Sequence, residues 1–533
     1  MLSLILMTLK GMMILAASVY GFSTLVRKND AVWIRRAPLW LFVSMYFIGM
    51  WGHTYWVAYF ALMLALPIAA KSRGDAAALF AVLIVSLPTV QHLVQFGSLY
   101  VTITSKFMFA GFGLTIAFLM NRGKTQVIKR AHLDVPMLII VVLEASQARD
   151  PSATATIRQL VPVFLTIWLP YYVLSRSINT AEEVRRFLLS FTLAGFVMAT
   201  VAAIEARLHW LIYKQIDALL GVNVIINGYS KMRAGMIRAP ASFPESTALA
   251  TFLVLAFMSA LALRDTFGSR AKWLFVLFVL LVGMVSANSR GAFIALGVGL
   301  VAWDLYTRRY GRLTMKLVGA GAIYLFALTA AQFSTYFAAM VGKDSGTQGT
   351  ADYRVQLLRR GLEEIHKHPI LGQNMKAALD SLQDLRQGEG IIDLVNGYIS
   401  YGLTLGYMGI FGLLAVFVTL CLAMLMARRK LRLNPVLIEP AACVFSVAAL
   451  SIFNSFFTGF GSFGSTTFYE ICALGSALWA MRTLAPIVKD GTGQVVRAPL
   501  TGTAALIAAD RARAAQARDQ ARDNAALPAP AGG

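Results

Sequence analysis

Apolar runs recur from one end of the chain to the other, and short polar connections separate them. Most of the runs hold roughly 17–22 residues, which is enough for a helix to cross a bilayer core of about 30 Å. The pattern therefore predicts an all-α polytopic integral membrane protein with about 12–15 membrane-spanning helices. The predicted spans are residues 2–25, 37–52, 54–70, 76–96, 104–121, 134–147, 158–175, 186–205, 242–263, 271–287, 290–307, 314–335, 396–427, 435–456 and 467–485.

A long polar interval, residues 342–395, interrupts this pattern. Apolar side chains recur within it at helical spacing, so it should contain a helix that begins near residue 352 and packs one apolar face on the membrane domain. This helix should end before the His-Pro pair at 368–369, because the residue that precedes a proline disfavours helical geometry. A connection of this length with a helix of its own is usually functional. The residues that define the expected packing face are Val355, Leu358, Leu362 and Ile365.

Two further segments depart from the pattern of spans. Residues 206–241 include an amphipathic stretch that we expect to lie on the membrane surface. The residues after 485 have no periodic apolar face and end in Pro, Ala and Gly, which predicts a disordered tail. The predicted organisation is spans one to twelve in 1–341, the large loop in 342–395, the last spans in 396–485 and the tail in 486–533.

Composition supports the membrane assignment and changes the interpretation of the positive net charge. The chain is 58% hydrophobic and only 14% charged, whereas a soluble protein carries about 25% charged residues. A net charge of +22 would suggest nucleic acid for a soluble protein. Here the basic residues cluster in connections that follow odd-numbered spans, which the positive-inside rule places in the cytoplasm together with the tail. We therefore expect these residues to meet membrane lipids and not nucleic acid, and we expect the 342–395 loop on the outer side.

Arginines on the outer side oppose this bias and need an anionic partner. A guanidinium presents a planar fork of donors that matches phosphate oxygens, so several of them suit a lipid-linked pyrophosphate. Arg290 and Arg354 are the leading candidates, and Arg238 is the third. Arg359 and Arg360 in the loop are further candidates for substrate binding.

Structural explanations stay open for two of these arginines. Arg354 could pair with Asp352 or Glu363 in a surface salt bridge, and Arg290 could reach the membrane surface with no specific partner.

No metal or cofactor is expected from the sequence. His366 and His368 have no cysteine or third histidine nearby, and all three cysteines fall in apolar segments.

The order of motifs in the second half resembles the O-antigen ligase and polysaccharide polymerase superfamily. SANSRGAF opens a span, HPILG ends the helix of the loop, and NGYISYGLTLGYMGI enters the next span; RAPASFPESTALA lies upstream. The resemblance covers roughly residues 238–425. It implies a GT-C-like helical bundle in the bacterial inner membrane that takes a glycan from undecaprenyl pyrophosphate on the periplasmic side, without nucleotide sugar or metal. In the ligases, arginines hold the donor pyrophosphate and a histidine in an H-N-x₉-G-x-x-G pattern assists the acceptor hydroxyl.

Val395 occupies the histidine position of that pattern, while Asn396, Gly406 and Gly409 match the rest. Valine cannot accept a proton, so either Asp393 serves as the base, or the protein is a polymerase with a different site, or catalysis is lost. Asp393 could instead cap the following helix.

We expect the polymerase, because polymerases of the superfamily often lack the ligase histidine. It would join undecaprenyl-pyrophosphate-linked repeat units in exopolysaccharide, capsule or O-antigen biosynthesis, alongside a flippase and a chain-length regulator of the same pathway. The expected catalytic residues are Arg290, Arg354 and Asp393, and Asn396 and Tyr398 are further substrate-binding candidates. The alternatives are a ligase that transfers glycan to a lipid A core or to protein, and a transporter of lipid-linked oligosaccharides.

Overall fold

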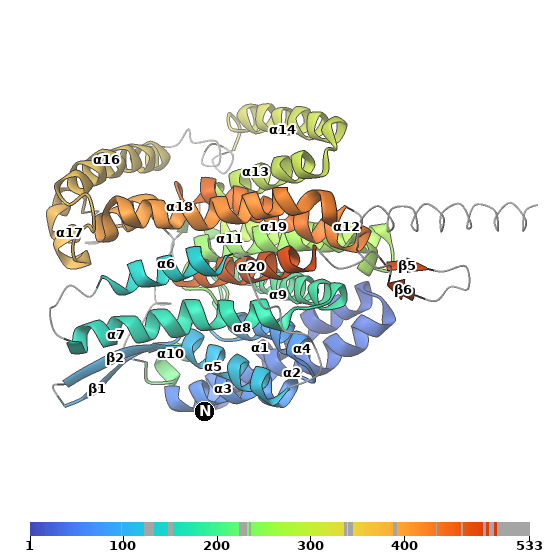
Figure 1. Ribbon diagram of the computed structural model, residues 1–533. Helices are drawn as coiled ribbons and strands as arrows, with labels where there is room; N and C mark the ends of the chain where they lie inside the picture. Colours follow the sequence, from blue (N-terminus) through green and yellow to red (C-terminus); the bar gives the residue numbers. More distant parts are fainter. Residues whose placement is uncertain are drawn as a thin grey trace, which may run out of the picture.

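Long helices run side by side through the computed structural model, most of them along a common direction (Figure 1). Strands are few and short in the described part of the chain. The prediction of an all-α polytopic membrane protein is confirmed. The structure describes residues 1–97, 99–121, 133–147, 153–222, 232–233, 236–334, 338, 345–386, 392–432, 434–459, 462–482, 487–489 and 495–497.

Most of the described helices overlap a predicted span. In the first half they are α1 (Leu2–Leu25), α2 (Lys28–Trp51), α3 (Tyr55–Ala69), α4 (Arg73–Ser86), α5 (Lys106–Met120), α6 (Asp134–Ala145), α7 (Ala153–Val163), which continues through a π-helical turn (Phe164–Trp168) into α8 (Leu169–Ser177), and α9 (Ala181–Leu208). In the second half they are α10 (Ile216–Leu219), α11 (Ser246–Ala262), α12 (Arg270–Ala287), α13 (Arg290–Thr307), α14 (Tyr310–Ala330), α16 (Ser345–Lys367), α17 (Met375–Ser381), α18 (Gly397–Leu431), α19 (Pro435–Asn454) and α20 (Ser462–Met481).

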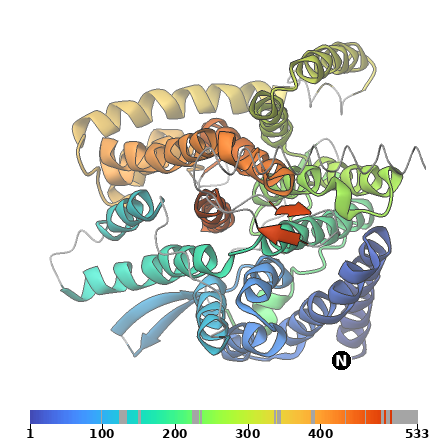
Figure 2. The ribbon, with the colours of Figure 1, turned by 45° about the vertical axis from the view of Figure 1, so that its right-hand side comes forward.

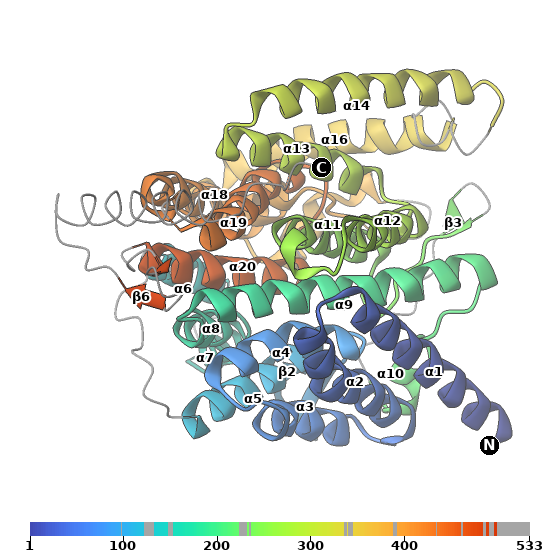
Figure 3. The ribbon, with the colours of Figure 1, turned by 90° about the vertical axis from the view of Figure 1, so that its right-hand side faces the viewer.

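Length and hydropathy identify eight of the described helices as able to cross a membrane. They are α1, α2, α9, α12, α14, α18, α19 and the continuous helix Thr154–Ser177. The shorter apolar helices α3, α5 and α11 lie among them. Helix α14 differs from the others because it has no buried residue, and Figure 3 shows it at the outer edge of the bundle.

Three of the predicted basic connections meet at one end of the bundle. Arg185 at the start of α9 pairs with Asp30 at the start of α2, with 2.8 Å between Nη2 and Oδ1. The Gly268 amide donates to the Leu25 carbonyl at 3.1 Å, so the α11–α12 connection lies at the same place. We call this the basic end and the opposite end, which carries the α16–α17 segment, the loop end.

The predicted span 76–96 is wrong over its second half. Helix α4 ends at Ser86, and Leu87 is extended, as expected before Pro88. The chain then forms an antiparallel hairpin of β1 (Gln91–Phe96) and β2 (Leu99–Ser105). The polar residues Gln91, His92 and Gln95 do not suit a membrane-crossing helix.

The two other unusual segments are described only in part. Within 206–241, the described residues include the one-turn helix α10 and a short hairpin of β3 (Met232–Arg233) and β4 (Met236–Ile237). Residues 223–231 and 234–235 lie outside the described residues. At the start of the predicted tail, β5 (Ile487–Lys489) pairs with β6 (Val495–Arg497), and residues 498–533 lie outside the described residues.

Helix α16 packs along α18, as Figures 1 and 2 show. It ends at Lys367, before Pro369 as predicted, and Gly372 adopts a left-handed conformation (φ 65°) in the turn that follows. The face predicted to pack is wrong for three of its four members, because Val355, Leu358 and Leu362 are exposed. From residue 352 on, where the burial of this helix is described, the buried residues are Leu357, Gly361, Glu364 and Ile365.

Helix α18 bends sharply at Gly406, whose backbone angles (φ 64°, ψ −160°) are not helical. A Cβ atom on Gly409 would lie 2.9 Å from the Tyr401 carbonyl oxygen. Residues eight positions apart in a straight helix are separated by about 12 Å. The first limb of α18, residues 397–405, therefore packs against the start of the second limb.

Candidate functional site

Three arginines from distant parts of the chain meet at the loop end. Arg238 precedes α11, Arg290 is the first residue of α13, and Arg354 lies in α16. Arg238 and Arg354 both interact electrostatically with Arg290 and with Asp393. The structure therefore brings together the three arginines that the sequence singled out, with Asp393 beside them.

Two of these guanidinium groups have buried donors without a protein partner. The Nε atoms of Arg238 and Arg354 are buried and make no hydrogen bond to any described residue. Arg354 donates from Nη2 to the Phe457 carbonyl at 3.4 Å and lies 5.9 Å from the centre of the Phe457 ring. Among the described residues Arg354 forms no ion pair, so the expected alternative of a surface salt bridge does not apply.

The electrostatics of the cluster favour an anion. Burial lowers the pKa of Arg238. The nearby charges of Glu245 and Asp393 raise this pKa, and the charge of Arg290 lowers it further. Burial and the nearby charge of Arg290 also lower the pKa of Arg354, while Asp393 raises it. A guanidinium stays charged even so. Three positive charges lie close together here with few carboxylates beside them, and such an arrangement attracts anions.

Tyr353 holds the Asp393 backbone next to this cluster. Its hydroxyl accepts a hydrogen bond from the Asp393 amide at 3.0 Å and donates one to the Asp393 carbonyl at 2.9 Å. The Val395 amide also donates to the Asp393 carbonyl, at 2.9 Å, which gives the chain a tight turn. The 392–396 segment thus runs directly beside α16, and its contact residue Tyr353 immediately precedes Arg354 in that helix.

Asn396 and Tyr398 have structural contacts in this arrangement. The Asn396 Oδ1 caps α18 by accepting from the amides of Tyr398 (3.0 Å) and Ile399 (3.2 Å), so the capping role considered for Asp393 belongs to Asn396. The Tyr398 hydroxyl donates to the Ile452 carbonyl on α19 at 2.7 Å. Both contacts fix the first limb of α18 in place.

Arg359 and Arg360 take part in different interactions from the other arginines of the site. Arg359 is exposed, with its Nε 3.3 Å from Glu363. Arg360 pairs with Glu363 and with Asp384, each at 2.9 Å. The ion pairs with Asp384 and Glu363 raise the pKa of Arg360. Both arginines pair with an acid, whereas Arg354 on the same helix forms no ion pair with the described residues.

The sequence prediction missed Glu205, which holds the loop that carries Arg238. Glu205 is fully buried near the end of α9 and accepts hydrogen bonds from the amides of Ile212 and Ala241, both at 2.9 Å. Ala241 has a left-handed backbone (φ 51°), a strained conformation for a residue with a side chain. An acid inside the last turn of an apolar span is the sequence signal that could have identified it.

No group of three or more His, Cys, Asp or Glu side chains that could hold a metal is present among the described residues.

Residues 275–414 match the family model for O-antigen ligase. This segment of the chain is similar to the O-antigen ligase family. It runs from α12 into α18 and includes Arg290, Arg354 and Asp393, while Arg238 lies upstream of it. Members of this family are glycosyltransferase-like enzymes that act on lipid-linked glycans. No curated protein matches the chain.

Proposed function

We propose that this protein is a polysaccharide polymerase that joins undecaprenyl-pyrophosphate-linked oligosaccharide repeat units. The reaction takes place at the loop end of the bundle, on the periplasmic face of the bacterial inner membrane. The observation that carries the proposal is the meeting of Arg238, Arg290 and Arg354, with two buried guanidinium Nε groups that have no hydrogen-bond partner among the described residues.

A lipid-linked pyrophosphate fits this cluster in charge and position. Its phosphate oxygens would accept hydrogen bonds from the buried Nε groups, and three arginines match a group with more than one negative charge. The cluster lies where α13 begins, and a lipid donor keeps its pyrophosphate at such a boundary because its chain stays in the bilayer.

The proposed reaction moves the growing chain onto a new repeat unit. A hydroxyl oxygen of the acceptor sugar attacks the anomeric carbon of the donor, and the bond from that carbon to the pyrophosphate oxygen breaks. The pyrophosphate leaves with the electron pair, and the arginines stabilise the charge that develops on it. Asp393 takes the proton of the attacking hydroxyl, as a carboxylate can do in acid–base catalysis.

A ligase is the second candidate, and the match to the O-antigen ligase family favours it. In that case the acceptor is a lipid A core or a protein, and the chain is transferred once. Val395 supports the polymerase, because it leaves this position without the histidine that the ligase pattern carries there.

Chain-length analysis with purified protein tests the proposal. The full chain in detergent is incubated with synthetic undecaprenyl-pyrophosphate repeat units, and the products are separated by size. A ladder of longer chains is expected. A single transfer to an added acceptor without a ladder would support the ligase. Transport of unchanged substrate across liposome membranes, with no transfer, would refute the enzyme.

Two variants on the same helix test the site. Arg354→Ala should lower the rate by roughly 10²–10³-fold, the usual effect of removing one donor that stabilises a developing charge. Arg359→Ala is the matched control, because its guanidinium is exposed and pairs with Glu363, and it should keep nearly full activity. If both variants are as active as the unchanged protein, the arginine cluster takes no part in the mechanism.

A further inference from the structure

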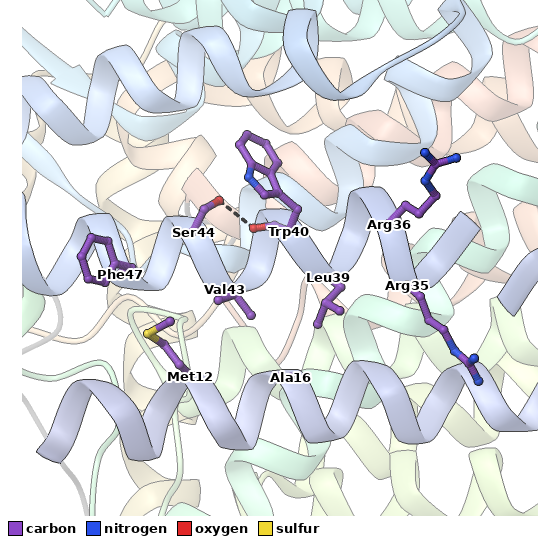
Figure 4. A pocket seen from close by; sticks show the side chains of 9 residues that line it. All are labelled: Met12, Ala16, Arg35, Arg36, Leu39, Trp40, Val43, Ser44 and Phe47. Atoms are coloured by element: carbon purple, nitrogen blue, oxygen red, sulfur yellow. Dashed lines mark hydrogen bonds between the residues drawn. The ribbon is translucent and has the colours of Figure 1, made fainter. Parts of the chain in front are cut away.

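A groove between α1 and α2 lies far from the arginine cluster. Figure 1 shows these two helices on the side of the bundle opposite α14 and α16. The groove is open to the surroundings and has a volume of about 420 Å³, within the range of sites for small ligands. Figure 4 shows the side chains that line it. They are Met12, Ala16, Arg35, Arg36, Leu39, Trp40, Val43, Ser44 and Phe47.

The groove is apolar along its length and basic at one end. Leu39, Val43 and Phe47 follow one another at four-residue spacing on α2, and Met12 and Ala16 face them from α1 (Figure 4). The apolar line continues from the pair Arg35–Arg36 for about 17 Å, at 1.5 Å per residue. This is close to the depth of one leaflet, half of a hydrocarbon core of about 30 Å.

Arg35 at the mouth is held in place by groups other than the acids of the described residues. Arg35 donates from Nε to the Ser23 hydroxyl at 2.8 Å, and its guanidinium lies 4.5 Å from the centre of the Tyr20 ring. In the part of the chain that the structure describes, neither Arg35 nor Arg36 forms an ion pair. Arg185 at the same end of the bundle differs, because it pairs with a carboxylate at 2.8 Å.

We propose that this groove is a binding site for one anionic phospholipid. The phosphate lies at Arg35, which turns toward α1 at the basic end of the groove, while Arg36 on the other side of α2 adds positive charge, and one acyl chain runs along Leu39, Val43 and Phe47. The position of the charge at one end of an apolar groove of leaflet depth matches an amphiphile with an anionic head. A zwitterionic headgroup fits less well, because no carboxylate lines the groove to receive its amine.

Lipid binding to the full chain in detergent tests this proposal. The probes are phosphatidylglycerol and phosphatidylcholine with the same acyl chains, followed by native mass spectrometry and thermal unfolding. Phosphatidylglycerol should stay bound and raise the Tm, while phosphatidylcholine should do neither. The double variant Arg35→Gln, Arg36→Gln should weaken phosphatidylglycerol binding about tenfold or more.

Two further variants separate the groove from general surface charge. Ala16→Leu narrows the apolar part and should weaken binding with both arginines present. Arg312→Gln, an exposed arginine at the basic end but outside the groove, should leave binding unchanged. Equal binding of both lipids, unchanged binding in the double variant, or the same Tm increase with inorganic phosphate alone would overturn the proposal.

Discussion

Replacing Tyr353 by Phe removes one hydroxyl from α16 and keeps the ring. That hydroxyl makes two hydrogen bonds to the backbone of Asp393, at 3.0 Å to the amide and 2.9 Å to the carbonyl. Each bond contributes about 0.5–1.5 kcal/mol net, so the loop loses about 1–3 kcal/mol that hold it beside the arginines. Since about 1.4 kcal/mol corresponds to a factor of ten, the productive loop position becomes roughly 5–150-fold less favourable.

The assay is the initial rate of chain extension at varied donor concentration, together with hydrogen exchange at the Asp393 amide. Tyr353→Phe should lower kcat about tenfold and leave the donor KM nearly unchanged, because the arginines that bind pyrophosphate stay in place. The Asp393 amide should exchange faster. Tyr407→Phe is the control, since that hydroxyl contacts His366 at 3.2 Å instead of the loop.

Two results would refute this reasoning. If exchange at Asp393 quickens while kcat stays within about twofold of the unchanged protein, then the position of Asp393 does not matter for the reaction. If exchange does not change, the hydroxyl does not hold the loop.

Two substitutions test the backbone structure that surrounds the site. Gly406→Ala should lower the Tm strongly and abolish activity, because its φ of 64° suits glycine and a Cβ atom would lie 2.5 Å from the Pro369 carbonyl oxygen; a Tm equal to that of the unchanged protein would contradict this. Glu205→Gln should cost about 1–3 kcal/mol, because the amide group offers one acceptor oxygen to two backbone amides. Activity should fall further than stability alone explains, since the loop through Ala241 carries Arg238; thermal unfolding and the ladder assay measure both effects.

The sequence was enough to predict the membrane fold and the meeting of the arginines, for one physical reason. A bilayer of fixed thickness forces the ends of successive helices into two layers. Arg238, Arg290 and Arg354 all lie at or beyond span ends on the same side, so topology places them in one layer before any tertiary contact is known.

The packing of α16 could not be predicted from its apolar spacing. The predicted face contained Val355, which is 67% exposed, whereas Leu357 is fully buried. The difference arises at Gly361, where a Cβ atom would lie 2.5 Å from the Ile399 side chain. A missing side chain permits this close approach, and hydrophobic periodicity counts only side chains that are present.

The motif NGYISYGLTLGYMG explains why a changed residue at 395 need not change the fold. Asn396 caps α18, Gly406 makes its bend, and Gly409 allows the two limbs to touch. All three residues shape the backbone of α18. Val395 contributes its side chain to the loop before this helix, and its amide donates a hydrogen bond to the Asp393 carbonyl whatever the side chain is. This backbone arrangement can therefore persist while the acceptor chemistry differs, which is the physical basis for proposing a polymerase in a chain whose residues 275–414 match the O-antigen ligase family.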